Sequence, residues 1–214
     1  MNIFVLSTGR TASTTFSKAC SHIENYSFGH ESLRDKISHE RLNYPDNHIE
    51  VDNRLSFFLG SLDQKYGNSA FYVHLLRNSS ETASSFNKRW QNKHSIIKAY
   101  AYAINFLQIE NLTKREKLNV CKDYVNITNA NIGLFLKDKS KVLEINVSTI
   151  KEDFEFFWNS IGAKGDINKA LDEFNVKYNP SLSTENENVV LNKNKISRRN
   201  SNLNSIFKFL KIKK

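Results

Sequence analysis

The fold is decided by residues 2–16, which read NIFVLSTGRTASTTF. Ile3 to Leu6 form an apolar run without polar alternation, which is typical of a strand buried on both faces of a parallel sheet. Ser7 to Thr15 are nearly all small or hydroxylated, and a helical pattern begins at the end of this segment. A strand, a tight loop and a helix N-terminus together present backbone N–H groups and a helix dipole that bind phosphate or sulfate. The sequence therefore predicts an anionic ligand at this loop.

The loop differs from the nucleoside triphosphate loop, whose pattern is G-x-x-x-x-G-K-[ST]. Counted from Gly9, the position of the second glycine holds Thr14, and no lysine follows it. Arg10 instead supplies a positive charge at the start of the loop. The alternative interpretation is an ordinary Ser/Thr-rich helix cap without a ligand.

A second apolar strand, residues 70–76, is followed by another basic group. The strand closes with Arg77-Asn78, at a position where nucleotide-binding folds often carry a metal-organising aspartate. Ser85 comes eight residues after Arg77, on the predicted next helix. A guanidinium fork and a hydroxyl donor near the first turns of a helix suit a dianionic phosphate.

The two loops together resemble those of sulfotransferases that use 3′-phosphoadenosine 5′-phosphosulfate (PAPS). In that family a basic residue precedes an S-G-[ST]-T-like turn, and a strand-end Arg-Asn is followed by a serine at the same spacing. Ala12 stands where the family usually has glycine. Residues 29–32 (GHES) and 51–60 (VDNRLSFFLG) are also similar to small bacterial-type members. The resemblance runs from residue 2 to about residue 180.

The resemblance implies transfer of a sulfuryl group from PAPS, without a metal, to a hydroxyl or amine of a small-molecule or carbohydrate acceptor. Arg10 is then catalytic: it stays protonated and steadies the bridging oxygen as charge develops. Arg77 and Ser85 bind the 3′-phosphate of the cofactor. The cofactor-binding residues of the first loop are Gly9, Arg10, Thr11, Ala12, Ser13, Thr14 and Thr15.

An acidic or imidazole group must accept the proton of the acceptor. Glu31 and His30 lie at the predicted carboxyl end of a strand, the edge where ligands bind in open α/β sheets. We expect Glu31 to be the base, since the GHES resemblance points to it, with His30 second and Asp52 as a further candidate. The alternative for Glu31 is that it only favours a helix N-terminus through the dipole.

The fold class expected is α/β, a three-layer P-loop-like fold with a central parallel sheet flanked by helices. Further short strands are expected near residues 25–28, 48–51 and 142–145. Helices are expected at 11–23, 31–41, 94–109, 113–136 and 151–161. Cys20 and Cys121 are interpreted as buried thiols, and His74 as a core histidine.

The charge is unevenly distributed. The net charge of the chain is +9, and residues 188–214 carry eight basic side chains and no acidic ones. We expect a sulfotransferase-like domain at 1–182 and a basic tail at 183–214, within which 203–212 has the pattern of a short amphipathic helix. The tail makes weak contact with an anionic membrane a further option, whereas no nucleic acid is expected because the body is nearly neutral.

Two other functions stay open: a P-loop-type small-molecule kinase, and a non-catalytic anion or nucleic-acid binder that acts through the tail. The missing G-K-[ST] pattern weakens the first. The strand beginning at residue 2 leaves no room for a signal peptide, and no apolar stretch is long enough to span a bilayer. A cytoplasmic protein is therefore expected.

Overall fold

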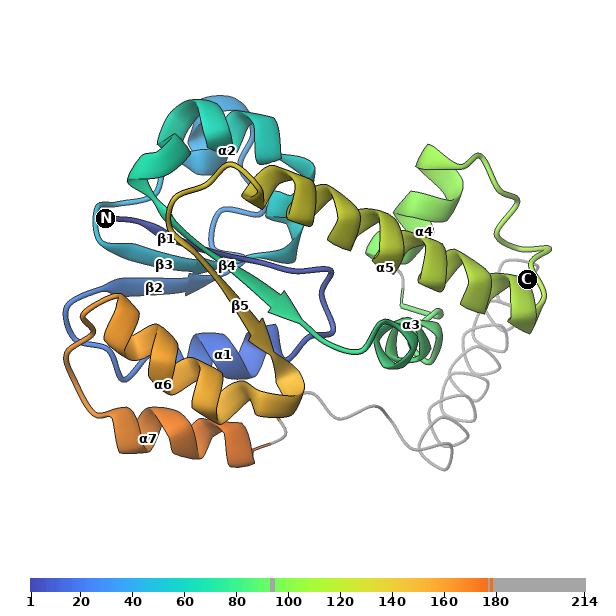
Figure 1. The fold of residues 1–214 in the computed structure, drawn as a ribbon. Coiled ribbons are helices and arrows are strands. Elements are labelled where there is room, and N and C mark those ends of the chain that lie inside the picture. Colours follow the sequence, from blue (N-terminus) through green and yellow to red (C-terminus); the bar gives the residue numbers. More distant parts are fainter. Residues whose placement is uncertain (93–94, 177, 179–214) are drawn as a thin grey trace, which may run out of the picture. The chain divides into compact units, whose positions relative to one another are not determined.

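The computed structural model describes residues 1–92, 95–176 and 178. A sheet of five parallel strands forms the centre, in the order β2-β3-β1-β4-β5 (Figure 1). The strands are β1 (Ile3–Leu6), β2 (Ser27–His30), β3 (His48–Val51), β4 (Phe71–Leu76) and β5 (Val142–Asn146). The parallel α/β sheet predicted from the sequence is confirmed.

The central strand β1 explains why both faces of the sheet are covered. Its four residues are fully buried, and successive side chains point to opposite faces. Ile3 and Val5 pack into one hydrophobic core, whereas Phe4 and Leu6 pack into another. A continuous apolar run is what a strand buried on two faces requires, so the expected three layers are present.

Helices cover each face. The first core includes residues of α1 (Ser13–Cys20), α6 (Ile150–Ser160) and α7 (Ile167–Asp172). The second includes residues of α2 (Leu59–Tyr66) and the C-terminal part of α5 (Lys114–Leu136). A third core joins α5 to α3 (Ser79–Asn87) and α4 (Ile96–Ala99). Figure 1 shows α1, α6 and α7 on one side of the strands and α2 with α5 on the other.

The expected helix at residues 31–41 is wrong. A turn follows β2, and only a 3₁₀ helix forms later, at Ser38–Leu42. Glu31 and Ser38 have positive φ angles of 54° and 53°, which a right-handed helix does not tolerate. The buried carboxylate of Glu50 also accepts a hydrogen bond from the Ser32 N–H at 2.8 Å, which competes with helix formation in this segment.

The expected helix at 94–109 is shorter than predicted and irregular. After α4 the chain forms a π-helix at Tyr100–Ile104. The Asn105 N–H donates to the Tyr100 carbonyl at 3.1 Å, five residues back. Residue 94 lies outside the described residues. The helix at 113–136 is confirmed as α5, whose start at Lys114 is fixed by a Thr113–Glu116 capping box.

The buried polar and thiol groups agree with the sequence interpretation. Cys20 and Cys121 are free and buried, and burial raises the pKa of both thiols, that of Cys121 to about 12. His74 is buried, and its Nε2 lies 3.3 Å from Asn129 Oδ1. Burial lowers the pKa of His74, so its ring is neutral at pH 7.

Within the described part of the chain, no helix has the length and apolar character needed to cross a membrane. The predicted boundary between residues 182 and 183 lies outside the described residues, as do the predicted basic tail and its helix at 203–212. The domain division therefore stays a prediction.

Gly165 provides a test of the packing of the α6–α7 connection against the segment that follows α1. It pairs with Ile23 as an isolated bridge, has a φ of 133°, and an added Cβ would lie 2.1 Å from the His22 carbonyl oxygen. We expect Gly165→Ala to lower the free energy of unfolding by about 1–3 kcal/mol from backbone strain alone, measured by urea denaturation.

Gly133→Ala is the matched control, because Gly133 lies inside α5 and an added Cβ there meets nothing within 4 Å. This change should raise the unfolding free energy by roughly 0.5–1 kcal/mol through the helix propensity of alanine. Equal stabilities of the two variants would contradict the packing described for Gly165.

Candidate functional site

The loop after β1 contains three residues with left-handed backbone. Gly9, Arg10 and Ala12 have φ angles of 83°, 61° and 62°. Such a turn directs successive N–H groups inward, as in the concave anion sites of other proteins. Ala12 is the N-cap residue of α1 and offers no side-chain acceptor to this helix, whose N-terminus is of the kind that binds anions.

Gly9 is required where the loop meets the segment after β3. A Cβ at this position would lie 3.1 Å from Asn53 Nδ2 and 3.4 Å from a ring carbon of Phe86. Thr11, which follows in the loop, is 2 % exposed. Its hydroxyl has no hydrogen-bond partner among the residues that the structure describes. A buried hydroxyl without a partner is costly, and an anion in the loop would supply an acceptor.

Guanidinium groups gather on the other side of the loop. Arg10 Nε donates to Ser85 Oγ at 3.2 Å, and Arg77 Nη1 donates to the carbonyl oxygen of Arg10 at 3.4 Å. Burial and the positive charges of Arg89 and Arg77 lower the pKa of Arg10 to about 10. Arg10 is therefore still protonated at neutral pH, although its pKa lies below the value expected from the sequence. Like charges held this close favour a multiply charged anion between them.

The structure brings Arg77 and Ser85, the two residues expected to share a phosphate, to the same residue, Arg10. Asn78 caps α3 by accepting a hydrogen bond from the Glu81 N–H at 3.1 Å. Glu81 also pairs with Arg77 through Nε and Nη2, both at 3.0 Å, which fixes the plane of that guanidinium.

Tyr124 of α5 binds the backbone of the loop at Thr8, a role that the sequence analysis missed. Its hydroxyl donates to the Thr8 carbonyl oxygen at 3.0 Å, and its ring lies edge-on to Phe86 with centroids 5.5 Å apart. Burial raises the pKa of Tyr124 to about 12. The sequence signal for this role was a tyrosine within the apolar face of a helix, because a buried hydroxyl needs a hydrogen-bond partner.

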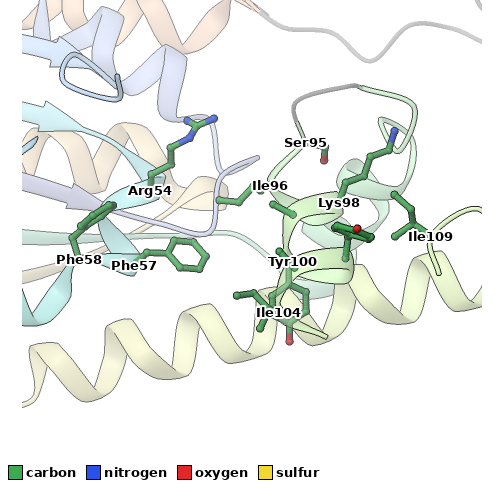
Figure 2. A pocket seen from close by; sticks show the side chains of 12 residues that line it. Arg54, Phe57, Phe58, Ser95, Ile96, Lys98, Tyr100, Ile104 and Ile109 are labelled. Atoms are coloured by element: carbon green, nitrogen blue, oxygen red, sulfur yellow. The ribbon is translucent and has the colours of Figure 1, made fainter. Parts of the chain in front are cut away.

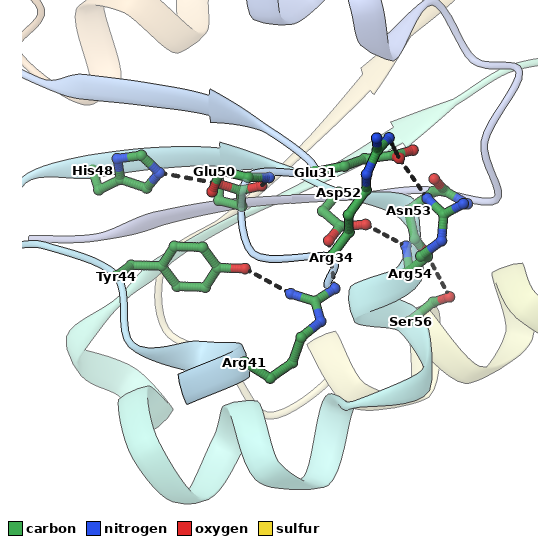
Figure 3. Close-up of polar contacts among 11 residues, drawn as sticks. Glu31, Arg34, Arg41, Tyr44, His48, Glu50, Asp52, Asn53, Arg54 and Ser56 are labelled. Atoms are coloured by element: carbon green, nitrogen blue, oxygen red, sulfur yellow. Dashed lines mark hydrogen bonds and ion pairs between the residues drawn. The ribbon is translucent and has the colours of Figure 1, made fainter. Parts of the chain in front are cut away.

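His30 and Glu31 lie beside the same loop but in different surroundings. His30 is exposed, and its Nε2 lies 3.4 Å from Ser13 Oγ in the first turn of α1. Glu31 Oε2 pairs with Arg54 Nη1 at 2.5 Å and with Arg34 Nη1 at 3.4 Å (Figure 3). Both contacts use Oε2, and the Oε1 atom of Glu31 takes part in neither of them.

Asp52, the third candidate base, is fully buried. Its carboxylate pairs with Arg41 Nη2 at 2.5 Å and accepts from the Arg54 N–H at 2.7 Å, which caps a 3₁₀ helix at Asn53–Phe57. Burial raises the pKa of Asp52. These contacts give Asp52 a structural role, because they fix the segment that carries Arg54 to Glu31 (Figure 3).

Glu50 of β3 supports the segment with the candidate bases and was not singled out from the sequence. It is fully buried and accepts from the Ser32 N–H at 2.8 Å and from the Ser32 hydroxyl at 2.5 Å. His48 Nε2 lies 3.0 Å from Glu50 Oε2 (Figure 3). A charged residue inside a short apolar strand was the sequence signal, because such a group is buried only with partners.

An apolar pocket of about 690 Å³ adjoins Arg54 (Figure 2). It lies between the segment with Phe57 and Phe58 and the helical turns from Ser95 to Ile104. No group of three or more His, Cys, Asp or Glu side chains suited to a metal ion occurs among residues 1–92, 95–176 and 178.

The chain is similar in fold to a solved sulfotransferase. The crystal structure of mouse sulfotransferase SULT7A1 complexed with PAP superposes with a TM-score of 0.52 at 12% sequence identity. The match covers 81% of this chain and 63% of the mouse chain, so the chain spans less than two thirds of that protein. No protein-family model matches the sequence, and no curated protein does. At this identity the likeness shows the fold.

The structural role of Asp52 is testable. Asp52→Asn leaves Arg41, whose side chain is 3 % exposed, with an uncompensated charge. We expect the free energy of unfolding to fall by about 3–5 kcal/mol, the scale for breaking one side of a buried ion pair. Urea denaturation followed by circular dichroism measures it.

Lys169→Gln is the control, since it breaks the exposed Lys169–Asp166 pair and should cost at most about 1 kcal/mol. If Asp52→Asn is as stable as this control but loses its chemical activity, Asp52 belongs to the reaction instead.

Proposed function

We propose that this chain is a sulfotransferase that moves a sulfuryl group from PAPS to a hydroxyl or amine of an acceptor. The observation that carries the proposal is the meeting of Arg10, Arg77 and Ser85 at the left-handed loop after β1. The loop lies at the carboxyl edge of the sheet, beside the point where the chain crosses from β3 to β4 on the other side of β1. The fold of a sulfotransferase solved with PAP supports it.

The residues of the site fit a donor with two anionic ends. The left-handed loop after β1 and the buried Thr11 hydroxyl suit the 5′-phosphosulfate, with Ser13, Thr14 and Thr15 in the first turn of α1. Arg77, with Ser85 nearby, suits the 3′-phosphate. Arg10 belongs to the loop after β1 and also contacts both Ser85 and Arg77.

In the transfer step, the acceptor oxygen or nitrogen forms a bond to sulfur while the bond from sulfur to the bridging phosphate oxygen breaks. Protonated Arg10 stabilises the negative charge that develops on the bridging oxygen. Glu31 Oε1 takes the proton of the acceptor, and Arg54 holds the Glu31 carboxylate in place. The products are the sulfated acceptor and PAP, and no metal ion is needed to balance the reaction.

The donor assignment predicts a nucleotide preference. The chain should bind PAP far more tightly than AMP in titration calorimetry, and Arg77→Ala should remove about one to two decades of PAP affinity. A lost charge-assisted hydrogen bond of about 1.5–3 kcal/mol gives this range. AMP affinity should change little.

Arg115→Ala, at an exposed position of α5, is the matched control and should bind PAP like the wild type. Equal affinities for PAP and AMP would overturn the donor assignment. Transfer from ATP with an absolute Mg²⁺ requirement would establish a kinase instead.

The base assignment predicts a separation of binding from turnover. Glu31→Gln keeps the shape of the side chain and removes its basicity, so turnover should fall by about two to four decades while PAP affinity stays nearly unchanged. The measurements are steady-state sulfation with PAPS and calorimetry with PAP.

Glu40→Gln, at an exposed position of the 3₁₀ helix Ser38–Leu42, controls for the loss of one negative charge. If Glu31→Gln turns over at the wild-type rate and His30→Ala does not, the base is His30.

A further inference from the structure

The apolar pocket beside Arg54 is a formed site with few polar groups. Twelve residues line it; those with a charged group or a hydroxyl are Arg54, Ser95, Lys98, Tyr100 and Tyr102, and the other seven are apolar. Phe57, Tyr102 and Ile104 are 53%, 66% and 62% exposed, although all three are large apolar or aromatic side chains. Contiguous exposed apolar side chains around a hollow are typical of a ligand-binding site.

One wall of the pocket is the π-helix Tyr100–Ile104. Its inner side is fixed, because Ala101 is fully buried and the Tyr100 hydroxyl donates to Asp123 Oδ2 at 2.5 Å. π-Helical turns are rare and occur mostly at functional sites. The irregular turn holds Tyr102, Ala103 and Ile104 toward the pocket rather than in the core.

The pocket and the candidate active site share one residue, Arg54 of the 3₁₀ helix Asn53–Phe57. Asn53 lies against Gly9 of the loop, Arg54 pairs with Glu31 and also lines the pocket, and Phe57 forms the opposite wall. At about 2.0 Å per residue, Asn53 to Phe57 spans only about 8 Å. Arg54 therefore adjoins both the pocket (Figure 2) and Glu31 (Figure 3).

We infer that this pocket binds the body of the acceptor, and that the acceptor is an apolar alcohol or phenol and not a carbohydrate. The inference rests on the proposed function. A sugar presents hydroxyls on every side, whereas most of the lining residues are apolar side chains that offer no hydrogen-bond partner. An apolar body with one hydroxyl fills the walls formed by Phe57, Phe58 and Ile96 and leaves its oxygen for Glu31. The volume of about 690 Å³ lies in the range of small-molecule sites.

Filling the pocket tests the inference with 2-naphthol as the probe. Ala103→Trp adds a large side chain at an exposed position of the pocket lining. We expect it to raise the KM for 2-naphthol, and its Kd from fluorescence titration in the presence of PAP, by at least about tenfold, the scale of a lost apolar pocket contact. The KM for PAPS and the Kd for PAP should not change. Ala130→Trp, at an exposed position of α5 outside the lining, should match the wild type.

The outcomes separate this inference from the proposed function. If the wild-type chain does not bind PAP, the proposed function is overturned. If PAP binds with its dependence on Arg77, the acceptor inference is overturned by any of three results: 2-naphthol fails to bind, Ala103→Trp leaves its Kd unchanged, or N-acetylglucosamine is sulfated faster than 2-naphthol. A different result identifies a membrane surface as the occupant of the pocket. In that case the wild-type chain binds phosphatidylserine vesicles, Ala103→Trp abolishes this binding, and the variant still binds 2-naphthol.

Discussion

The left-handed turn from Gly9 to Ala12 is the constraint on which the rest of the site depends. Such backbone is strained for arginine and alanine, so neighbouring groups must hold it. Tyr124 binds the Thr8 carbonyl from below, and Arg77, which follows β4, binds the Arg10 carbonyl. Contacts with two other parts of the chain, α5 and the residue after β4, therefore hold the strained backbone in place. The turn lies at the end of the fully buried strand β1.

The same turn concentrates positive charge. Partial burial of Arg10, together with the positive charges of Arg89 and Arg77, lowers the pKa of its guanidinium to about 10. In a protein without a ligand, this repulsion is a cost to the folded state. An anion between the groups removes the cost, so ligand binding and stability are coupled through the same three side chains. A phosphate-rich donor is the kind of ligand that gains most from this arrangement.

Apolar and acidic residues alternate along β3 and the residue that follows it, and all of them are buried. Ile49 and Val51 join the hydrophobic core, whereas Glu50, together with Asp52 just beyond the strand, is fully buried and bonded to polar groups. Glu50 fixes the backbone after β2 through Ser32, and Asp52 fixes the turn that carries Arg54. Because Arg54 pairs with Glu31 and also lines the apolar pocket, these two carboxylates fix the segments on which the relative position of Glu31 and the pocket depends.

Local sequence patterns were enough to establish the parallel α/β class, all five strands and the loop at residues 7–15, because apolar runs and short-range spacing are local properties. Long-range contacts settled the rest. They replaced the expected helix at 31–41 by a turn bound to Glu50, and they joined Tyr124 to Thr8 across 116 residues. The expected helix at 94–109 became a π-turn that forms one wall of the pocket. Each of these results depends on groups far apart in the chain, whose contacts no local pattern of residues specifies.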